Sequence, residues 1–249
     1  GEARRTKSDW MKIEQERGIS VSSSVMTFEH KDLIFNLLDT PGHEDFSEDT
    51  YRTLTAADAA VMVLDVAKGI EPQTLKLFEV CRLRDIPIIT FVNKLDREGR
   101  DTFDIISEIE DKLALDVRPM QWPAASGRRF RGTADLKTNE YLRFIKADEG
   151  GNPATGAERI SLDDRAALEA AFNDNDLLDE FLDEAELARE YGEFNQQSFR
   201  EGHMTPVYFG SALRMFGVRE LIDALADLVP PPQTEKAMKA GQDVEITPT

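Results

Sequence analysis

Short apolar runs that alternate with helix-like segments are the feature that most limits how this chain can fold. Runs at residues 33–38, 59–66 and 86–92 predict buried strands, because each is apolar and of strand length. Segments 74–84 and 101–115 instead carry apolar residues at helical spacing. Because strands that alternate with helices usually form a mostly parallel sheet, we expect an α/β fold.

The same pattern extends toward both ends of the chain. Residues 21–38 predict a hairpin, and residues 43–53 predict the start of a helix. Further on, a strand is expected at 206–209 and a helix at 218–229, which the prolines at 230–232 terminate.

Residues 120–203 interrupt the alternation and predict an inserted α/β subdomain. They contain a basic loop at 128–131 and a strongly acidic helical segment after Ser161, where Ser161 and Asp164 resemble a helix start. We therefore predict three parts: a main α/β domain over residues 1–119 and 204–232, the inserted subdomain over 120–203, and a linker over 233–249.

The composition limits which partners the protein can bind and in which cellular compartment we expect it. With 48 acidic and 30 basic residues and a formal charge of −18, the chain has no global field that attracts nucleic acid. We expect no binding to free DNA, and contact with RNA only through a local patch. The single cysteine, Cys81, excludes a disulfide framework and fits a reducing compartment. No run reaches the roughly 18 apolar residues of a membrane span, and no signal-peptide pattern is seen, so we expect a cytoplasmic protein without membrane contact.

Two polar motifs follow predicted strands, and open α/β sheets bind ligands at the carboxyl ends of strands. The first motif is Asp39-Thr40-Pro41-Gly42-His43. A carboxylate at Asp39 can hold a magnesium ion, usually through water, and Gly42 lets the backbone offer its N–H to a terminal phosphate. His43 can orient a water for in-line attack on that phosphate. The alternative is an ordinary strand-to-helix turn.

The second motif, Asn93-Lys94-Leu95-Asp96, supplies the groups that a guanine site needs. The Asp96 carboxylate can accept from the N1–H and the 2-amino group of guanine, a pair of donors that adenine does not present. Asn93 can bond the ring edge or tie neighbouring loops together, and the Lys94 stem can lie over the base plane. A site built on such bonds rejects an analogue that lacks them. Alone, the tetrapeptide also fits a helix cap, but downstream of the first motif it indicates a nucleotide site.

Several segments together resemble the translational GTPases. The resemblance implies a P-loop GTPase-type fold, a mostly parallel sheet with flanking helices, and it covers nearly the whole chain. The general resemblance rests on Arg17 to Ser20, Asp39 to Leu54, Asn93 to Arg97 and Gly210-Ser211-Ala212. Residues 43–54 and 81–85 narrow it to the bacterial peptide chain release factor three family, within the superfamily of elongation factor G.

The resemblance implies roles for the matching positions. Ser20, where most relatives carry threonine, and Asp39 would hold Mg²⁺, and His43 would be the catalytic residue. GTP or GDP would be the bound nucleotide. The residues implied for nucleotide binding are Asp39, Thr40, Pro41, Gly42, Asn93, Lys94, Asp96, Ser211, Ala212 and Leu213. The Ala212 backbone N–H would meet the guanine carbonyl oxygen; the alternative for Ser211 is a helix-entry cap.

A Gly-x-x-x-x-Gly-Lys-Ser/Thr phosphate loop does not occur in these 249 residues. In the family, the strand that precedes this loop lies between the strands that end at Asp39 and near Asp65. We therefore expect a fragment cut at both ends that lacks this first strand. Hydrogen bonds to charged groups contribute roughly 1.5 to 3 kcal/mol each, so we expect feeble nucleotide binding and no hydrolysis.

The implied function is that of a ribosome-stimulated GTPase, which promotes release or recycling of the stop-codon-reading release factor. A second candidate is an elongation factor G or ribosomal protection-type GTPase, which residues 46–54 disfavour. A third, of another class, is an inactive binding module that acts through its acidic insert. The acidic residues between Asp174 and Glu190 predict either a solvated helix face opposite Leu177 and Phe181 or a docking surface, which by resemblance would meet the ribosomal stalk protein. The loop 128–131 is either solvated or contacts ribosomal RNA phosphates.

Overall fold

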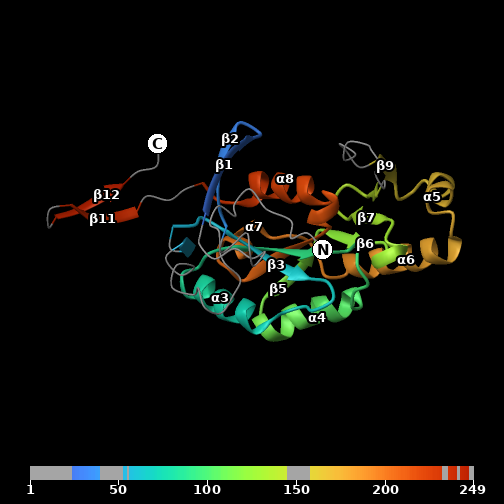
Figure 1. Ribbon diagram of the computed structural model, residues 1–249, viewed down its shortest axis with the longest axis horizontal. Helices are drawn as coiled ribbons and strands as arrows, with labels where there is room; N and C mark the ends of the chain where they lie inside the picture. The colour runs from blue at the N-terminus through green and yellow to red at the C-terminus, as the bar shows by residue number, and fades with distance from the viewer. Residues whose placement is uncertain are drawn as a thin grey trace, which may run out of the picture.

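The computed structural model describes residues 24–39, 53–54, 56–144, 158–231, 235–239 and 242–246 (Figure 1). A four-stranded parallel sheet in the order β3-β4-β10-β5 forms its centre. This sheet confirms the predicted α/β fold. Its strands are β3 (Ala60–Asp65), β4 (Ile88–Asn93), β10 (Met204–Phe209) and β5 (Asp116–Pro119).

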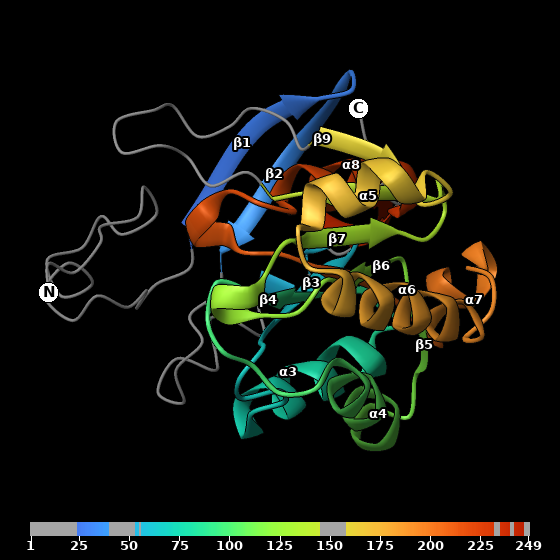
Figure 2. The same ribbon diagram turned by 90° about the vertical axis from the view of Figure 1, so that its right-hand side faces the viewer.

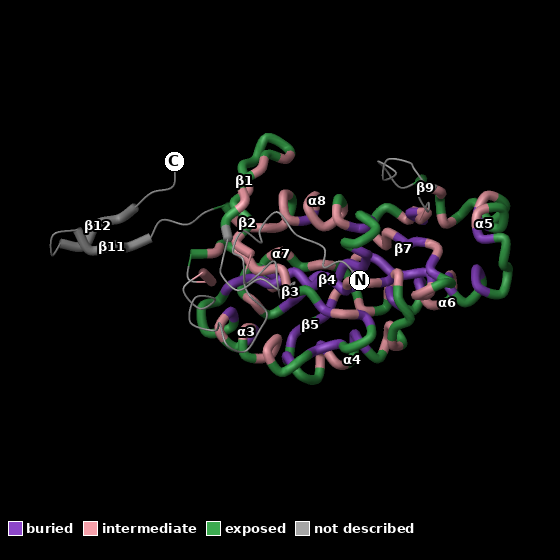
Figure 3. Tube along the Cα trace, viewed as in Figure 1, coloured by how far each residue is buried: buried purple, intermediate pink, exposed green. Residues whose placement is uncertain are grey.

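Helices cover both faces of this sheet (Figures 1 and 2). On one face lie α3 (Pro72–Leu83) and α4 (Thr102–Leu113), whose apolar side chains pack with Ile88 and Val92 of β4. On the other face lie α7 (Gln196–Arg200) and α8 (Val218–Leu228), which pack with Ile89 and Phe91. Because both faces are covered, β4 is buried from end to end except at Asn93. Buried segments gather at the centre of the main body in Figure 3.

The helix ends follow local capping chemistry. The α4 helix begins after Asp101, whose side chain accepts the Asp104 N–H at 3.1 Å, and it ends at Leu113, where Ala114 caps it with a φ of 50°. The predicted span of 101–115 was therefore slightly too long. The α3 helix begins with Pro72, two residues before the predicted start, because proline fits the first turn of a helix.

A hairpin of β1 (Ser24–His30) and β2 (Leu33–Asp39) forms a separate two-stranded antiparallel sheet. The predicted hairpin is therefore confirmed. Within the described part of the chain, β3 pairs with β4 alone, and Val63 of β3 is 55% exposed. The strand that we expect between β2 and β3 is not among the described residues, so its place stays a prediction.

Polar contacts join the turn end of this hairpin to α8, where Lys31 lies near both Asp223, at 3.3 Å, and Asp227. The His30 Nε2 atom lies 2.7 Å from Asp223 Oδ1, and Lys31 Nζ lies 3.0 Å from Asp227 Oδ1. Burial alone would raise the pKa of Asp223, but hydrogen bonds from His30 and Lys31 outweigh this effect and lower the pKa below its ordinary value. These contacts hold the strand that ends at Asp39 against the main body.

The inserted segment forms a second sheet, antiparallel in the order β6-β7-β8-β9, which packs with α5 and α6. Its buried Trp122 and Tyr141 belong to the same hydrophobic cluster as Leu64 and Ile105 of the main domain. The insert therefore shares a continuous core with the main sheet, and the domain boundaries stay predictions. The elements are β6 (Gln121–Pro123), η2 (Gly127–Arg129), β7 (Gly132–Asp135), β8 (Glu140–Arg143), β9 (Glu158–Ser161), α5 (Arg165–Phe172) and α6 (Asn175–Arg189).

The helix start that we predicted at Ser161 was wrong. Ser161 is the last residue of β9, and α5 begins at Arg165 after Asp164, whose side chain accepts the Ala167 N–H at 3.1 Å. Asp164 thus caps the helix from outside instead of lying in its first turn.

The acidic helix α6 has the expected amphipathic form. Leu177, Leu178 and Phe181 are buried in the insert, whereas Leu182 is only partly buried. The exposed face carries Asp176, Asp179, Glu180, Asp183 and Glu186. This arrangement confirms the solvated-face interpretation and leaves docking as a separate question.

Described residues also follow the prolines, in the part of the chain predicted as a linker. This part contains an antiparallel hairpin of β11 (Glu235–Lys239) and β12 (Gln242–Ile246). A linker can contain such a two-stranded hairpin, so the linker stays a prediction. In the described part of the chain, no helix is long and apolar enough to cross a membrane.

Candidate functional site

The candidate site lies where the carboxyl ends of β3, β4 and β10 meet. In the parallel register Asp65 of β3 lies beside Asn93 of β4, and the Gly210 N–H donates to the Val92 carbonyl at 3.0 Å. The Asn93-Lys94-Leu95-Asp96 motif and the Gly210-Ser211-Ala212 segment therefore meet at one edge of the sheet, although they are more than a hundred residues apart. This is the edge at which open α/β sheets bind ligands.

Asn93 joins two loops through its side-chain oxygen. Asn93 Oδ1 accepts the backbone N–H of Lys94 at 2.7 Å and the backbone N–H of Ala212 at 2.9 Å. The structure thus places Asn93 as a tie between loops, one of the two roles weighed from sequence. The predicted bond from the Ala212 N–H to a guanine carbonyl would have to share or replace this contact, and it stays a prediction.

Asp96 is held by the residue that we expected to close the site. The Ser211 hydroxyl donates to Asp96 Oδ1 at 2.5 Å, and its oxygen accepts the Arg214 N–H at 3.3 Å. Ser211 is fully buried and caps the short helix η3 (Ala212–Arg214), which confirms the alternative interpretation of a helix-entry cap, whereas its role at a guanine stays a prediction. Leu213, the third residue expected here, is 47% exposed.

Lys94 forms an ion pair that sequence analysis missed. Lys94 Nζ lies 2.6 Å from Asp65 Oδ2, and the Ala67 N–H donates to the other oxygen of that carboxylate at 2.9 Å. Burial alone would raise the pKa of Asp65, but these two hydrogen bonds and the charge of Lys94 lower it overall. The signal in the sequence was Asp65 itself, which stands at the end of an apolar run as Asp39 does at the end of another.

The other predicted site residues are only partly described. Asp39 is the last residue of β2, whereas Ser20 and Thr40, Pro41, Gly42 and His43 lie outside the described residues. Among the described residues no group of three possible metal ligands is present. The Asp39 carboxylate at a strand end is nevertheless an oxygen donor of the type that Mg²⁺ prefers, so the donor chemistry fits this ion.

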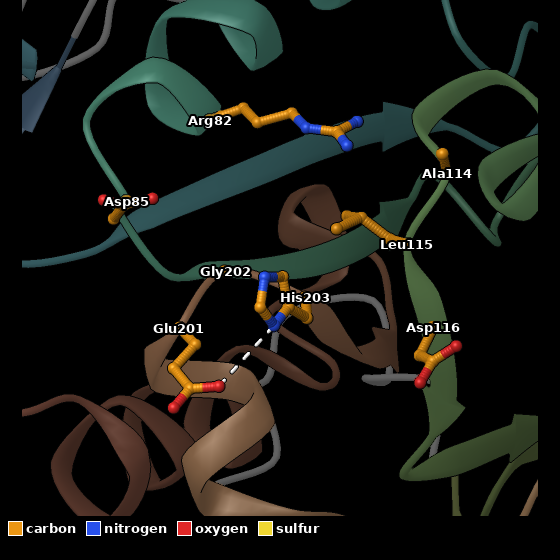
Figure 4. A pocket seen from close by; sticks show the side chains of 8 residues that line it. All are labelled: Arg82, Asp85, Ala114, Leu115, Asp116, Glu201, Gly202 and His203. Carbon is orange, nitrogen blue, oxygen red and sulfur yellow. Dashed lines mark ion pairs between the residues drawn. The ribbon is translucent and has the colours of Figure 1, made fainter.

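Two hollows lie away from this edge. One, of about 350 Å³, lies at the amino ends of β4, β5 and β10, where His203 Nδ1 lies 3.6 Å from Glu201 Oε2. Figure 4 shows these two side chains facing each other. This hollow is lined by Arg82, Asp85, Ala114, Leu115, Asp116, Glu201, Gly202 and His203. The other, of about 440 Å³, lies between α4 and the end of α6 and is lined by Phe103, Leu187, Glu190 and Tyr191. The first hollow is thus at the opposite ends of the strands from Asn93 and Asp96.

Known proteins resemble this chain along most of its length. It is 49% identical to "Peptide chain release factor 3" of Nitrosomonas europaea. The matched region has 246 residues and covers 95% of this chain and 44% of that protein. Proteins of the same name from Nitrosomonas eutropha and Staphylococcus aureus are each 50% identical, and cover 99% and 97% of the chain. The chain spans less than half the length of these relatives, 45% in both of the latter cases. The predicted resemblance to release factor three is thereby confirmed.

The fold also has a solved counterpart. The crystal structure of a Thermus thermophilus protein, ttk003000868, superposes with a TM-score of 0.70 at 21% identity, over 92% of this chain and 35% of that one. At this identity the likeness shows the fold alone. The family profile of the Elongation factor Tu GTP binding domain matches residues 1–231. The chain therefore belongs to the family of the Elongation factor Tu GTP binding domain and is a domain of a translational GTPase.

Proposed function

We propose that the chain is the guanine-nucleotide-binding part of a translation termination factor, a ribosome-stimulated GTPase that works in the cytoplasm. The whole protein promotes release or recycling of the stop-codon-reading release factor from the ribosome. Identities of 49% and 50% to proteins named peptide chain release factor 3 support this proposal over elongation factor G and the ribosomal protection type.

The single observation that carries the proposal is the contact between residues 93–96, at the end of β4, and residues 210–212, which follow β10. Asp96 is held by the buried Ser211, and Asn93 is held to Ala212, so the ends of β4 and β10 form one polar surface. A carboxylate there meets the N1–H and 2-amino donors of guanine, and adenine cannot supply both. Discrimination follows because an incorrect base leaves these polar groups unpaired.

Hydrolysis requires groups from the first motif as well. We assign His43 the orientation of the attacking water, and the Gly42 N–H a contact with the terminal phosphate. Asp39 and Ser20 are the residues that would hold Mg²⁺, which neutralises charge on the phosphates when it is bound.

The first experiment is a titration of the chain with fluorescent GDP in magnesium buffer, in competition with unlabelled GDP and ADP. We expect displacement by GDP and not by ADP, with weak affinity and no GTP turnover, because the sequence contains no phosphate-loop motif. Tight binding would refute the claim that this loop is indispensable. Equal displacement by both nucleotides would refute the guanine assignment.

Asp96→Asn provides a sharper test of the base contact. An asparagine amide can donate to the 2-oxo group of xanthine, whereas the aspartate accepts from the 2-amino group of guanine. We therefore expect the variant to prefer xanthosine diphosphate over GDP. An unchanged preference for GDP would show that Asp96 does not face the base.

The acidic face of α6 supports a proposed partner, the ribosomal stalk protein. This face adjoins the hollow at Leu187 and Tyr191, and Leu187 is 51% exposed. Together they offer apolar contact beside negative charge, which suits a basic partner.

Charge reversal tests this docking surface in the full-length protein. Asp179 is paired with Arg165 at 2.6 Å, so reversal there would also break a local contact. Asp176→Lys with Asp183→Lys leaves that pair intact and still reverses two charges on the exposed face. We expect weaker ribosome-stimulated hydrolysis with unchanged GDP affinity. Unchanged stimulation would argue against docking through α6. If the full-length protein neither hydrolyses GTP nor removes release factor, the binding-module alternative gains support.

A further inference from the structure

The loop that carries Asp96 is held from the insert as well as from the central sheet. We call residues 93–99 the recognition loop and residues 125–131 the insert loop. The sheet holds the recognition loop near its two ends: the Leu95 N–H donates to the Gly210 carbonyl, and the Arg100 N–H to the Val66 carbonyl, each at 3.1 Å. Ser211 holds the Asp96 side chain, so it is the backbone on either side of Asp96 that depends on further contacts.

The insert loop supplies three hydrogen bonds to that segment. The Gly127 N–H donates to the Leu95 carbonyl at 2.9 Å, directly before Asp96. The Gly99 N–H donates to Ser126 Oγ at 3.1 Å, and the Arg128 N–H donates to Glu98 Oε1 at 3.3 Å. The two loops thus contact each other on both sides of Asp96.

The backbone of the insert loop is shaped for this approach. Gly127 has a φ of 62°, a conformation that favours glycine, and a Cβ atom at this position would collide with the carboxylate of Glu98. Ala125, two residues earlier, also has a positive φ of 62°. Of the two, only Ala125 adopts this conformation against its local preference, so the loop around Ser126 has a defined and locally costly shape.

We propose that Ser126 and Gly127 are positioning residues of the guanine site, which hold the recognition loop so that Asp96 meets the base. The inference rests on the proposed guanine-binding function and deepens it, because it makes base selectivity depend on the insert. Neither residue contacts the nucleotide. Both act through the backbone that carries Asp96.

The first measurement does not depend on nucleotide. Amide hydrogen exchange of the nucleotide-free chain is followed in a peptide that covers residues 94–100. Ser126→Ala removes the acceptor of the Gly99 N–H, and we expect roughly fivefold faster exchange in this peptide, the effect of one typical hydrogen bond. Ser126→Thr keeps the hydroxyl and should exchange like the wild type. Ser161→Ala is the matched control, because Ser161 Oγ also accepts a single backbone N–H, that of Asp163 at 3.2 Å.

The second measurement compares GDP with inosine diphosphate, which lacks the 2-amino group. If Ser126 orients Asp96, Ser126→Ala lowers the preference for GDP roughly threefold and Ser126→Thr restores it, whereas a general loss of stability would weaken both nucleotides equally. Exchange in Ser126→Ala that equals that of Ser161→Ala, or an unchanged preference, would overturn the positioning role. A wild-type chain with no preference for GDP would instead show that the proposed guanine site itself is wrong.

Discussion

Replacement of Asn93 by alanine should affect stability and base recognition at once. Its side-chain oxygen accepts two backbone N–H groups, from Lys94 at 2.7 Å and from Ala212 at 2.9 Å. A hydrogen bond contributes about 1 kcal/mol net, so loss of both should lower the free energy of unfolding by about 2 kcal/mol. Ala212 is exposed, so in the variant water can bond to its freed N–H group. The loss of unfolding free energy therefore stays near this value.

The assay combines thermal unfolding by circular dichroism with the GDP titration. In a domain of this size each kcal/mol shifts Tm by about 2 to 4 °C, so we expect Asn93→Ala to lower Tm by about 4 to 8 °C. Asn139→Ala is a matched control in the insert, because the Asn139 amide also makes two bonds, to Arg189 at 2.7 Å and to Asp163 at 3.0 Å. The control should lose stability but keep its affinity for GDP.

Two results would refute this reasoning. A Tm of Asn93→Ala within about 2 °C of the wild type would show that the tie between the β4 and β10 ends carries little free energy. Unchanged GDP affinity despite a lower Tm would show that Asn93 holds the loops without contributing to the base site.

Three further predictions address the surroundings of the site. The pKa of Asp65 is lowered in the folded protein, so its contribution to stability is present above an unfolded pKa of about 3.9 and is lost as the pH falls through the lower folded value. Asp65→Asn removes the charge that pairs with Lys94, so in urea titrations the free energy of unfolding of the variant should fall less steeply below about pH 4 than that of the wild type. The same pH dependence in both proteins would contradict this. Gly132→Ala should destabilise the protein strongly, because a Cβ atom there would meet a backbone carbonyl of β8. Gly202→Ala has open space around it and should cost only about 1 kcal/mol of backbone strain. Equal losses of unfolding free energy in denaturant would refute the distinction. Asp223→Asn should speed hydrogen exchange of the β1–β2 hairpin at low salt, with a smaller difference at high salt, and exchange like that of the wild type would mean that the ion pairs to α8 do not hold the hairpin.

The local elements were largely predictable from sequence because their signals are local. The run at 86–92 is apolar because β4 is covered on both faces, and the helical spacing around Ile105 and Ile109 matches the buried face of α4. Errors occurred where two signals compete. Asp164 and Ser161 can both cap a helix, and only pairing of β9 with β8 decides that Ser161 belongs to a strand.

The candidate site was predictable as a set of residues but not as a geometry. Residue chemistry indicated Asn93 and Asp96, because a guanine site needs donors and acceptors of these kinds, and the family resemblance added Ser211. They did not indicate that Lys94 pairs with Asp65, since that contact depends on the parallel register between β3 and β4. Ser20 and residues 40–43 lie outside the described residues, and their roles stay predictions.

By itself, the sequence determined the α/β class, the guanine-type motif and the amphipathic form of the acidic helix. Each of these depends on residue type and short-range spacing, which a linear chain displays directly. Only the tertiary structure decided that Asp96 bonds to Ser211, that Asn93 ties two loops, and that Ser126 and Gly127 support the recognition loop. Those contacts join segments that are about 30 to 120 positions apart, and their geometry is set by strand order and packing, which no local pattern specifies.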